Sequence, residues 1–295
     1  MTNKLLFLKL GGSLITDKTR PRTVKPEILK RLCEEIASAR ERDPNLVLVL
    51  GHGSGSFGHV AAKKYATRGG VSSPPPSLPR KRGRDWFSPP RGEMPDGAGG
   101  GRNYLPGFSG VWHEARALNV FVMDALREAG IPSMALPASA SVISSDGKVS
   151  SWDVAPFRRA LVNGIVPVVH GDVIFDEVKG GTILSTEDLF MHLAGELRPQ
   201  RILLAGLEDG IYADFPVRKH RVEVVTPQSI HELSASIGAS AGTDVTGGMN
   251  SKVRQMLALV EQHEGLEVLL FSGEIVGATE QALRGEKIGT LITSK

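Results

Sequence analysis

Four glycine-rich segments of the sequence contain residue types that suit phosphate binding. Each lies beside an apolar run, at residues 9–13, 51–59, 170–172 and 246–252. Backbone N–H groups that glycine leaves accessible next to a helix start bind anions. Because ligands of open α/β sheets bind at the carboxyl ends of the strands, we expect the four segments to meet at one sheet edge.

Three lysines accompany these segments. Lys9 lies inside an apolar run, where a charged partner explains a lysine better than solvation does. Lys18 follows the first glycine segment, and Lys252 lies one turn after Gly248, so that its side chain leans back toward the start of that helix. Each alone is compatible with a surface lysine. Together they predict a cationic clamp on a polyphosphate, as phosphoryl transfer requires.

Other phosphate-binding motifs fit less well. Residues 53–58, GSGSFG, match the dinucleotide pattern G-x-G-x-x-G after a strand. That pattern also needs an acidic residue on the next strand, about 20 residues later. The sequence there is SSPPPSLPRK, so NAD or FAD binding is not expected. The P-loop pattern and the protein-kinase motifs are absent from the sequence.

Alternating apolar elements predict the fold that carries these segments. We expect strands at 4–10, 46–50, 133–136, 165–169, 201–205 and 267–271, and helices at 26–42, 110–129, 152–163, 186–196 and 248–263. Several strands are apolar throughout, which is typical of strands covered by helices on both faces. The pattern predicts one α/β domain over residues 1–295, an αβα sandwich with a mainly parallel central sheet.

Residues 71–107 differ from the rest of the chain in composition. They contain eight prolines and seven glycines, which predicts a long inserted loop outside the packed core. Six basic and three acidic side chains give the segment a net charge of +3, equal to that of the whole chain. The rest of the chain is therefore neutral, and we expect no nucleic-acid partner.

The remaining bulk features place the protein in the cytoplasm. No apolar run approaches the roughly 18 residues of a membrane span, and the N-terminal residues do not form a signal peptide. The single cysteine, Cys33, lies in the helix expected at 26–42 and is interpreted as a half-buried packing residue. No cluster with metal-ligand spacing is present, so no protein-built metal site is expected.

Taken in order, the segments KLGGSLITDK, GHGSGSFGH, VPVVHGD, LLAGLEDGIY and DVTGGMNSK resemble the amino acid kinase superfamily, and within it the isopentenyl phosphate kinases. GSFGH is the most specific of them. The resemblance covers nearly the whole chain outside 71–107. It implies ATP- and Mg²⁺-dependent phosphorylation of isopentenyl phosphate to isopentenyl diphosphate, by an enzyme that is commonly a homodimer. It also implies an acceptor-binding N-terminal part and an ATP-binding C-terminal part.

The resemblance also implies roles for individual residues on the ATP side. Lys9 would lie under the ATP phosphates, and Lys18 would stabilise the transferring phosphoryl group. The other expected nucleotide contacts are Gly11, Gly12, Ser13, Gly55, Leu207, Gly248 and Lys252. Many relatives have aspartate where this chain has Leu207. This replacement removes a side-chain contact to the nucleotide and leaves room for a backbone contact.

On the acceptor side, the resemblance implies that Ser54, His59 and Gly171 contact the substrate. A phosphate monoester is mostly dianionic at neutral pH, so its attacking oxygen needs no general base. We therefore predict that His59 anchors the acceptor phosphate and does not act as a base. His52 and His170, at strand ends, are interpreted as structural hydrogen-bonding residues.

The pocket for the acceptor's apolar tail is less clearly indicated. Five apolar residues share one face of the helix expected at 110–129: Val111, Ala115, Leu118, Val122 and Leu126. Such a stripe fits an ordinary core, whereas the matching helix of relatives borders the prenyl cavity. The segment 71–107, which precedes this helix, is interpreted as a lid or spacer at the pocket mouth.

Three alternatives remain open at this point. A fosfomycin kinase would have the same fold and a pocket for a short phosphonate. A regulator that kept the fold and lost catalysis is less favoured, because Lys9, Lys18 and Lys252 are all present. A nucleic-acid-binding role through the basic segment would show as salt-dependent retention.

Overall fold

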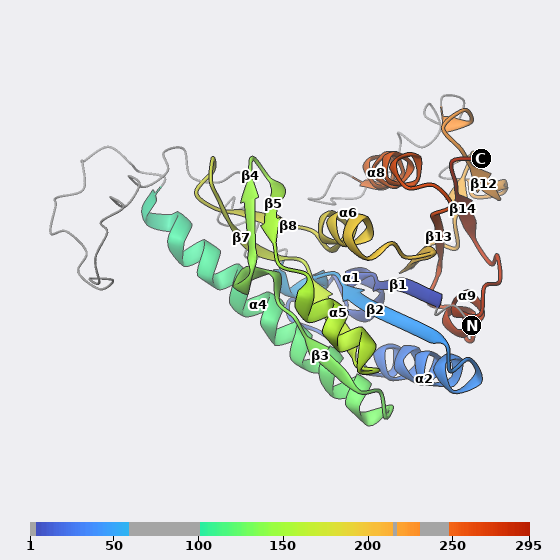
Figure 1. The fold of residues 1–295 in the computed structure, drawn as a ribbon, viewed down its shortest axis with the longest axis horizontal. Coiled ribbons are helices and arrows are strands. Elements are labelled where there is room, and N and C mark those ends of the chain that lie inside the picture. The colour runs from blue at the N-terminus through green and yellow to red at the C-terminus, as the bar shows by residue number, and fades with distance from the viewer. Residues whose placement is uncertain (1–3, 59–100, 215–216, 231–247) are drawn as a thin grey trace, which may run out of the picture.

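The computed structural model describes residues 4–58, 101–214, 217–230 and 248–295. Its centre is an eight-stranded sheet, and every neighbouring pair in it is parallel except β13 with β14 (Figure 1). In spatial order the strands are β12 (Val224–Val225), β14 (Thr290–Ile292), β13 (Glu267–Ser272), β9 (Arg201–Gly206), β1 (Lys4–Leu10), β2 (Leu46–His52), β6 (Val166–His170) and β3 (Ser133–Ala135).

The central strands are buried on both faces. Along β1, Phe7 belongs to one apolar cluster, whereas Leu6 and Leu8 belong to another. In β2, Val49 and Leu50 divide in the same way. Successive side chains of a strand point to opposite faces, so a strand that is apolar at every position needs a helical layer on each side.

Helices supply both layers, which confirms the expected αβα sandwich. Beside Leu6 and Leu8 lie α2 (Pro26–Arg42), α4 (Gly101–Glu128) and α9 (Ala278–Leu283). The face of Phe7 is covered by α5 (Ala155–Val162), α6 (Thr186–Leu197) and α8 (Gly248–Gln262). The expected helical stripe is part of the core: Leu118, Val122 and Leu126 are fully buried in the α4 layer.

A second, smaller sheet was not predicted from the sequence. Its order is β5 (Lys148–Trp152), β4 (Val142–Ser145), β7 (Asp172–Asp176) and β8 (Thr182–Leu184), and it lies beside the N-terminal half of α4 (Figure 1). Short elements complete the described fold: α1 (Gly12–Ile15), the 3₁₀ turn η2 (Ala138–Ala140), and the hairpin of β10 (Ile211–Tyr212) and β11 (Arg221–Val222).

The carboxylate of Asp176 joins the turns of this smaller sheet. It accepts hydrogen bonds from the backbone N–H groups of Gly147 (2.8 Å) and Lys179 (2.7 Å) and from the Ser144 hydroxyl (2.7 Å). Burial alone would raise the pKa of Asp176, but these bonds outweigh it and lower the pKa to about 2. The ionised carboxylate therefore stabilises the smaller sheet.

Two predicted helices were placed wrongly at their starts. Helix α4 begins at Gly101, so the end of the segment expected as a loop, residues 101–107, is helical. Adding turns to a formed helix costs little, and Phe108 packs on Phe175 with ring centroids 5.5 Å apart. Residues 71–100 lie outside the described residues. Helix α5 begins at Ala155, because Trp152 ends β5 and the Asp153 carboxylate accepts from the Ala155 N–H.

Two further observations bear on the sequence-based expectations. Cys33 is fully buried and not half-buried, and desolvation raises the pKa of its thiol to about 12, so it is a packing residue. Among the described residues, every helix is too short or too polar to span a lipid bilayer.

Candidate active site

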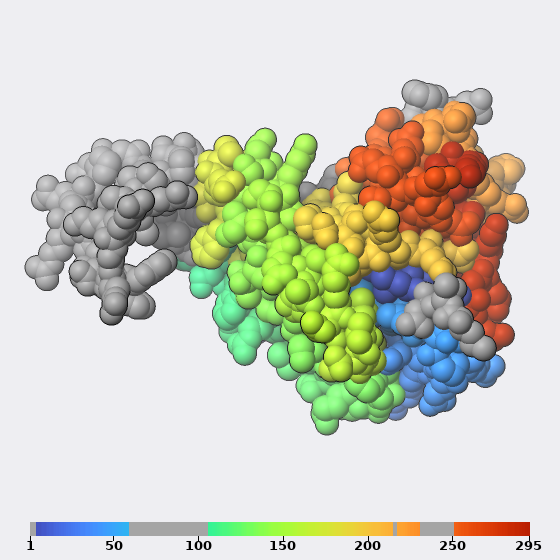
Figure 2. All heavy atoms as spheres, viewed as in Figure 1, coloured from blue at the N-terminus to red at the C-terminus, as the bar shows by residue number. Residues whose placement is uncertain are grey.

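The carboxyl ends of five parallel strands meet at one edge of the central sheet. Leu10 pairs with His52 of β2 and with Ala205 of β9, and His52 pairs with His170 of β6. Strand β13 ends in register with β9. The glycine-rich segments after β1, β2 and β6 therefore lie side by side, as predicted. Figure 2 shows a recess between the smaller sheet, in green, and α8, in orange-red, with α6 in yellow between them.

The first two glycine segments touch backbone to backbone. A Cβ atom placed on Gly12 would lie 2.4 Å from the Gly55 nitrogen, and one on Gly53 would lie 2.9 Å from the Gly12 nitrogen. Gly55 also adopts a positive φ of 52°, which disfavours a side chain there. The Gly11 N–H donates to the Ala205 carbonyl at the end of β9 (2.8 Å). These glycines are required because any larger residue would force the two loops apart.

Lys9 forms a buried ion pair with Glu187 of α6. Their side chains are only 12% and 7% exposed. Phe7, two residues before Lys9, lies on the same face of β1 and contacts the Phe190 ring, one helical turn after Glu187 (centroids 5.0 Å apart). This aromatic contact sets α6 against β1 so that the carboxylate reaches the ammonium group.

Lys252 of α8 acts on the same carboxylate. Burial alone would raise the pKa of Glu187, but the charges of Lys9 and Lys252 and the Lys9 hydrogen bond hold it below its usual value. Helix α8 is tied to α6 three residues later, where Gln255 Nε2 donates to Asp188 Oδ1 (2.7 Å). Glu187 is therefore an anion that two cations stabilise, and the neighbouring hydrogen bond fixes the helix that carries the second one.

The first residues of α6 also connect the loops after β2 and β6. The Thr186 hydroxyl donates to the His52 carbonyl (2.6 Å) and accepts from the Gly171 N–H (3.0 Å). Helix α6 approaches β2 closely because position 51 is glycine: a Cβ there would lie 2.5 Å from the Thr186 methyl group. Gly171 is thereby held beside Thr186, on the helix that presents Glu187.

The two strand-end histidines have the structural role expected of them. His52 Nε2 lies 3.1 Å from Asn119 Oδ1, and the rings of His52 and His170 are 5.1 Å apart. Burial, followed by the proximity of His170, lowers the pKa of His52 to about 3, so its ring is neutral at physiological pH. His170 Nδ1 lies 3.2 Å from the Gly171 carbonyl. Both rings therefore help to hold the loops that follow them.

Lys18 lies on an exposed turn beside the second glycine segment. That turn is anchored at Arg22, whose N–H donates to the Ser56 carbonyl (3.3 Å) and whose guanidinium pairs with Glu114 of α4 (3.2 Å). Ser54 starts the helical turn at 55–58, where its carbonyl accepts from the Phe57 N–H (3.0 Å). The turn carrying Lys18 is thus fixed to the loop that contains Ser54.

The structure brings most of the predicted site residues to this edge. Lys9 lies near the end of β1, the joined segments carry Gly11, Gly12, Ser13, Ser54, Gly55 and Gly171, and Lys252 acts on the Lys9 partner. Leu207 follows β9, is 42% exposed, and accepts through its carbonyl from the Ser272 hydroxyl (3.0 Å). Gly248 begins α8. His59 lies outside the described residues.

Sequence reasoning missed Glu187 and Thr186. Both follow Ser185, which caps α6 in a capping box with Asp188. Acidic residues are common in the first turn of any helix, so the segment STED indicates a helix start and gives no sign of an ion pair. Within the described ranges, no three His, Cys, Asp or Glu side chains gather in a way that could hold a metal ion.

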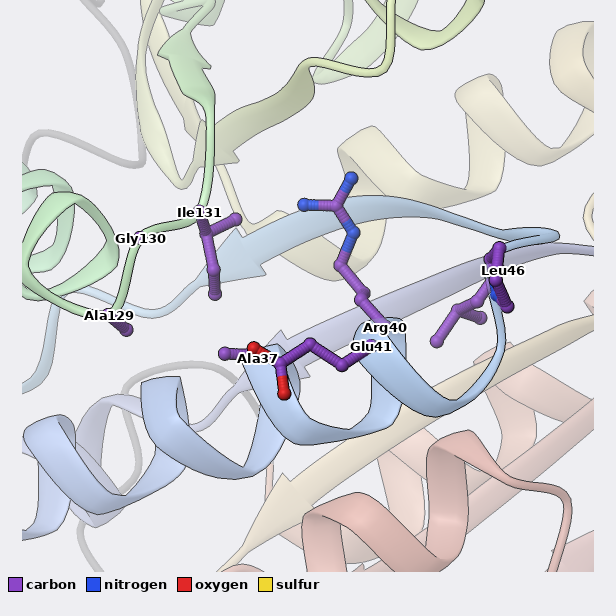
Figure 3. A pocket seen from close by; sticks show the side chains of 8 residues that line it. Ala37, Arg40, Glu41, Leu46, Ala129, Gly130 and Ile131 are labelled. Atoms are coloured by element: carbon purple, nitrogen blue, oxygen red, sulfur yellow. The ribbon is translucent and has the colours of Figure 1, made fainter.

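A separate pocket lies away from this edge. It is formed at the C-terminal ends of α2 and α4, and Figure 3 shows Arg40 and Glu41 lining it together with Ile131. Leu46, which also lines it, begins β2. The pocket is therefore at the opposite end of the strand from the glycine segments and is not part of the candidate site.

Comparisons with known proteins agree with this geometry. Residues 4–272 match the amino acid kinase family. The chain is 31% identical to an isopentenyl phosphate kinase from Methanothermobacter thermautotrophicus, over 99% of this chain and 100% of that protein. It is 33% identical to one from Haloferax volcanii, over 98% of each. A crystal structure described as isopentenyl phosphate kinase superposes with a TM-score of 0.76 at 29% identity, covering 98% of this chain and 100% of that one. The chain therefore belongs to the amino acid kinase family and, within it, to the isopentenyl phosphate kinases.

Proposed function

We propose that this protein transfers the γ-phosphoryl group of ATP to the phosphate of isopentenyl phosphate and releases ADP and isopentenyl diphosphate. The observation that carries the proposal is the Lys9, Glu187 and Lys252 cluster beside two glycine segments that touch. It stands at the sheet edge where α/β proteins bind ligands. Relatives at about the same length are named isopentenyl phosphate kinases.

The chemistry requires charge compensation more than proton transfer. An oxygen of the acceptor phosphate forms a bond to the γ-phosphorus, and the bond from that phosphorus to the β,γ-bridging oxygen breaks, so that this oxygen leaves with ADP. The acceptor is largely dianionic at neutral pH because its second pKa is about 6. The main obstacle is therefore repulsion between two polyanions, which positive charges fixed in advance reduce.

The charge cluster suits this task. Lys9 and Lys252 supply two positive charges; the carboxylate of Glu187 pairs with the first and is stabilised by the charge of the second before the nucleotide arrives. Without a carboxylate between them, two lysines in a partly buried site would repel each other. We assign Lys9 and Lys252 to the ATP phosphates and Lys18 to the transferring phosphoryl group, with Glu187 as the residue that positions the first two.

The glycine segments divide between donor and acceptor. In this proposal Gly11, Gly12 and Ser13 lie under the donor phosphates, and Gly55, Leu207 and Gly248 complete the nucleotide side. Ser54, Gly171 and His59 hold the acceptor, with His59 as an anchor for its phosphate. In this proposal the acceptor is held by the N-terminal part of the chain, and the C-terminal part binds the nucleotide together with the first glycine segment and Gly55. Contact of Gly53 with Gly12 supports this arrangement because it places the two groups of loops against each other.

Magnesium would enter with the nucleotide. Mg²⁺ usually keeps several waters and binds through substrate phosphates with one or two carboxylates, so a cage of protein ligands is not needed. When bound, Mg²⁺ would neutralise the negative charge of the phosphates that the lysines do not compensate. The chain's own contribution is to orient the phosphates with Lys9 and Lys252.

We also propose that the protein forms a homodimer. Strand β3 is the last strand of the central sheet, and Met134 on it is 48% exposed. On α4, Trp112, Val120 and Phe121 are 38 to 50% exposed. Apolar side chains gathered next to an open sheet edge suit a second copy of the chain. Light scattering after size exclusion should give twice the monomer mass, and Phe121→Glu should shift it toward the monomer.

A panel of acceptors tests the proposed activity. ADP release is measured with Mg²⁺-ATP and isopentenyl phosphate, dimethylallyl phosphate, geranyl phosphate, fosfomycin, acetylglutamate or UMP. We expect isopentenyl phosphate to give the highest kcat/KM. Activity on fosfomycin alone would show a phosphonate kinase on the same fold, and no activity on any acceptor would show a protein that kept the fold without catalysis.

A further inference from the structure

Thr16 is fully buried at the point where the two glycine segments meet. It follows α1 and ends that short helix, its N–H donating to the Gly12 carbonyl (3.0 Å). Its hydroxyl donates to the same carbonyl (2.7 Å) and accepts from the Ser56 N–H (2.9 Å). One hydroxyl therefore uses its donor on the first loop and its acceptor capacity on the second.

The second of these bonds caps a helical turn from outside it. Residues 55–58 are helical, so the N–H of Ser56 has no carbonyl partner within its own turn. Such an N–H group normally donates to the side chain of the residue just before the helix. Here the cap comes from Thr16, 40 residues earlier in the chain. The same Thr16 hydroxyl therefore caps the helical turn of the second loop and binds the first loop.

The surroundings leave little freedom around this hydroxyl. A Cβ on Gly55 would lie 2.1 Å from Thr16 Oγ1, so the Gly55 backbone packs directly on it. On the other side of Ser56, the Ser56 hydroxyl accepts from the Thr23 N–H (3.2 Å). Lys18 lies two residues after Thr16, between these two anchored positions. The hydroxyl therefore fixes the loop of Gly12, the loop of Gly55 and the start of the turn carrying Lys18.

We propose that Thr16 is a positioning residue of the transfer reaction, whose hydroxyl sets the separation between the donor loop and the acceptor loop. This inference rests on the proposed function, in which Gly12 belongs to the donor side, and Ser54 and His59 of the second loop belong to the acceptor side. Phosphoryl transfer needs the attacking oxygen about 3 to 3.5 Å from phosphorus and in line. Each loop keeps its own substrate contacts when the link is broken, so binding of either substrate alone depends little on Thr16.

The variant Thr16→Val keeps the shape of the side chain and removes both hydrogen bonds. We expect a fall of about 10- to 100-fold in the single-turnover rate of transfer at saturating ATP and isopentenyl phosphate, as displacements near 1 Å produce. The KM of each substrate should change less than about threefold. Thr16→Ser keeps the hydroxyl and should recover most of the rate, and Thr16→Cys, a weaker hydrogen-bonding residue, should fall between them.

Thr290 provides a matched control. It is also fully buried, and its hydroxyl donates to the Val222 carbonyl (2.6 Å) and accepts from the Ile211 N–H (2.8 Å). It lies in β14, three strands from β1 in the central sheet. Thr290→Val should lower Tm by about as much as Thr16→Val does. Unlike Thr16→Val, it should leave the single-turnover rate per folded molecule unchanged.

The outcomes separate the inference from the proposed function. Wild-type protein that transfers no phosphoryl group to isopentenyl phosphate overturns the proposed function and, with it, this inference. Active wild type together with an unchanged rate in Thr16→Val overturns the inference alone. If Thr16→Val does not fold, the serine and cysteine variants decide: a rate in Thr16→Ser as low as that of Thr16→Cys overturns it, and the graded order supports it.

Discussion

The substitution Glu187→Gln removes the charge between two lysines while keeping the size of the side chain. In the wild type this carboxylate and the Lys9 ammonium are both buried, at 7% and 12% exposure. Breaking a buried ion pair by neutralising one partner costs about 3 to 5 kcal/mol. Loss of the lysine proton relieves that cost, so the pKa of Lys9 in the variant should lie below its reference value near 10.4.

The pH dependence of activity then reports this change. If charged Lys9 binds the ATP phosphates, kcat/KM for ATP should begin to fall with rising pH at a lower pH in Glu187→Gln than in the wild type. The loss of stability in Glu187→Gln should become smaller as pH rises. A lysine whose pKa is lowered in the folded state destabilises that state most at pH values below the lowered pKa. The difference in free energy of unfolding between the variant and the wild type should therefore narrow as pH rises toward about 10.

Kinetics over pH 6 to 10 and urea denaturation at the same pH values measure both effects. Glu187→Asp, which keeps the charge on a shorter side chain, serves as the control and should retain the wild-type pH profile at a reduced rate. Parallel pH profiles for Glu187→Gln and the wild type, with equal stability at pH 7, would refute the claim that Glu187 keeps the lysines charged and in place.

Three further variants test other contacts. Gly12→Ala places a methyl group 2.4 Å from the Gly55 nitrogen, so it should abolish transfer and lower the free energy of unfolding, measured by urea denaturation, by about 3 kcal/mol. The control Gly110→Ala, with open space around it, should leave stability unchanged or raise it by up to about 1 kcal/mol. Gln255→Leu breaks the bond to Asp188 and should raise KM for ATP about tenfold with little change for the acceptor; an equal effect of the exposed Gln262→Leu would contradict that. Asp176 has a lowered pKa of about 2, so its ionised form stabilises the fold above pH about 4, and this stabilisation is lost as pH falls from about 4 to 2. Asp176→Asn should therefore be less stable than the wild type at pH 7 and about equally stable at pH 2. An equal loss of stability at both pH values would contradict this role of the carboxylate.

Sequence reasoning succeeded where one strong pattern governs local structure. Strand β1 and helix α2 have the predicted bounds, because an unbroken apolar run and a proline-started amphipathic helix are unambiguous. The smaller sheet was missed because β4 and β5 are short and rich in serine, and their pairing depends on tertiary contacts. The start of α4 was missed because glycine and Pro106 disfavour a helix that packing of Phe108 supports.

The candidate site divides in a similar way. Glycine segments and Lys9 were identifiable because each residue type is unusual at its position. Glu187 was not, because its significance comes from Phe7 packing on Phe190, a contact between residues 183 positions apart that no local pattern encodes. The role of Thr16 likewise depends on its meeting Ser56 across 40 residues. The anchoring role of His59 stays a prediction.

The central claim is that the Lys9 cluster drives transfer to the phosphate of isopentenyl phosphate. The most direct test follows ATP, isopentenyl phosphate and Mg²⁺ by ³¹P NMR with the wild type and with Lys9→Met. We predict that the paired doublets of a diphosphate monoester grow in step with ADP in the wild type and are lost in the variant. ADP with free inorganic phosphate, or equal diphosphate formation by both proteins, would contradict the account.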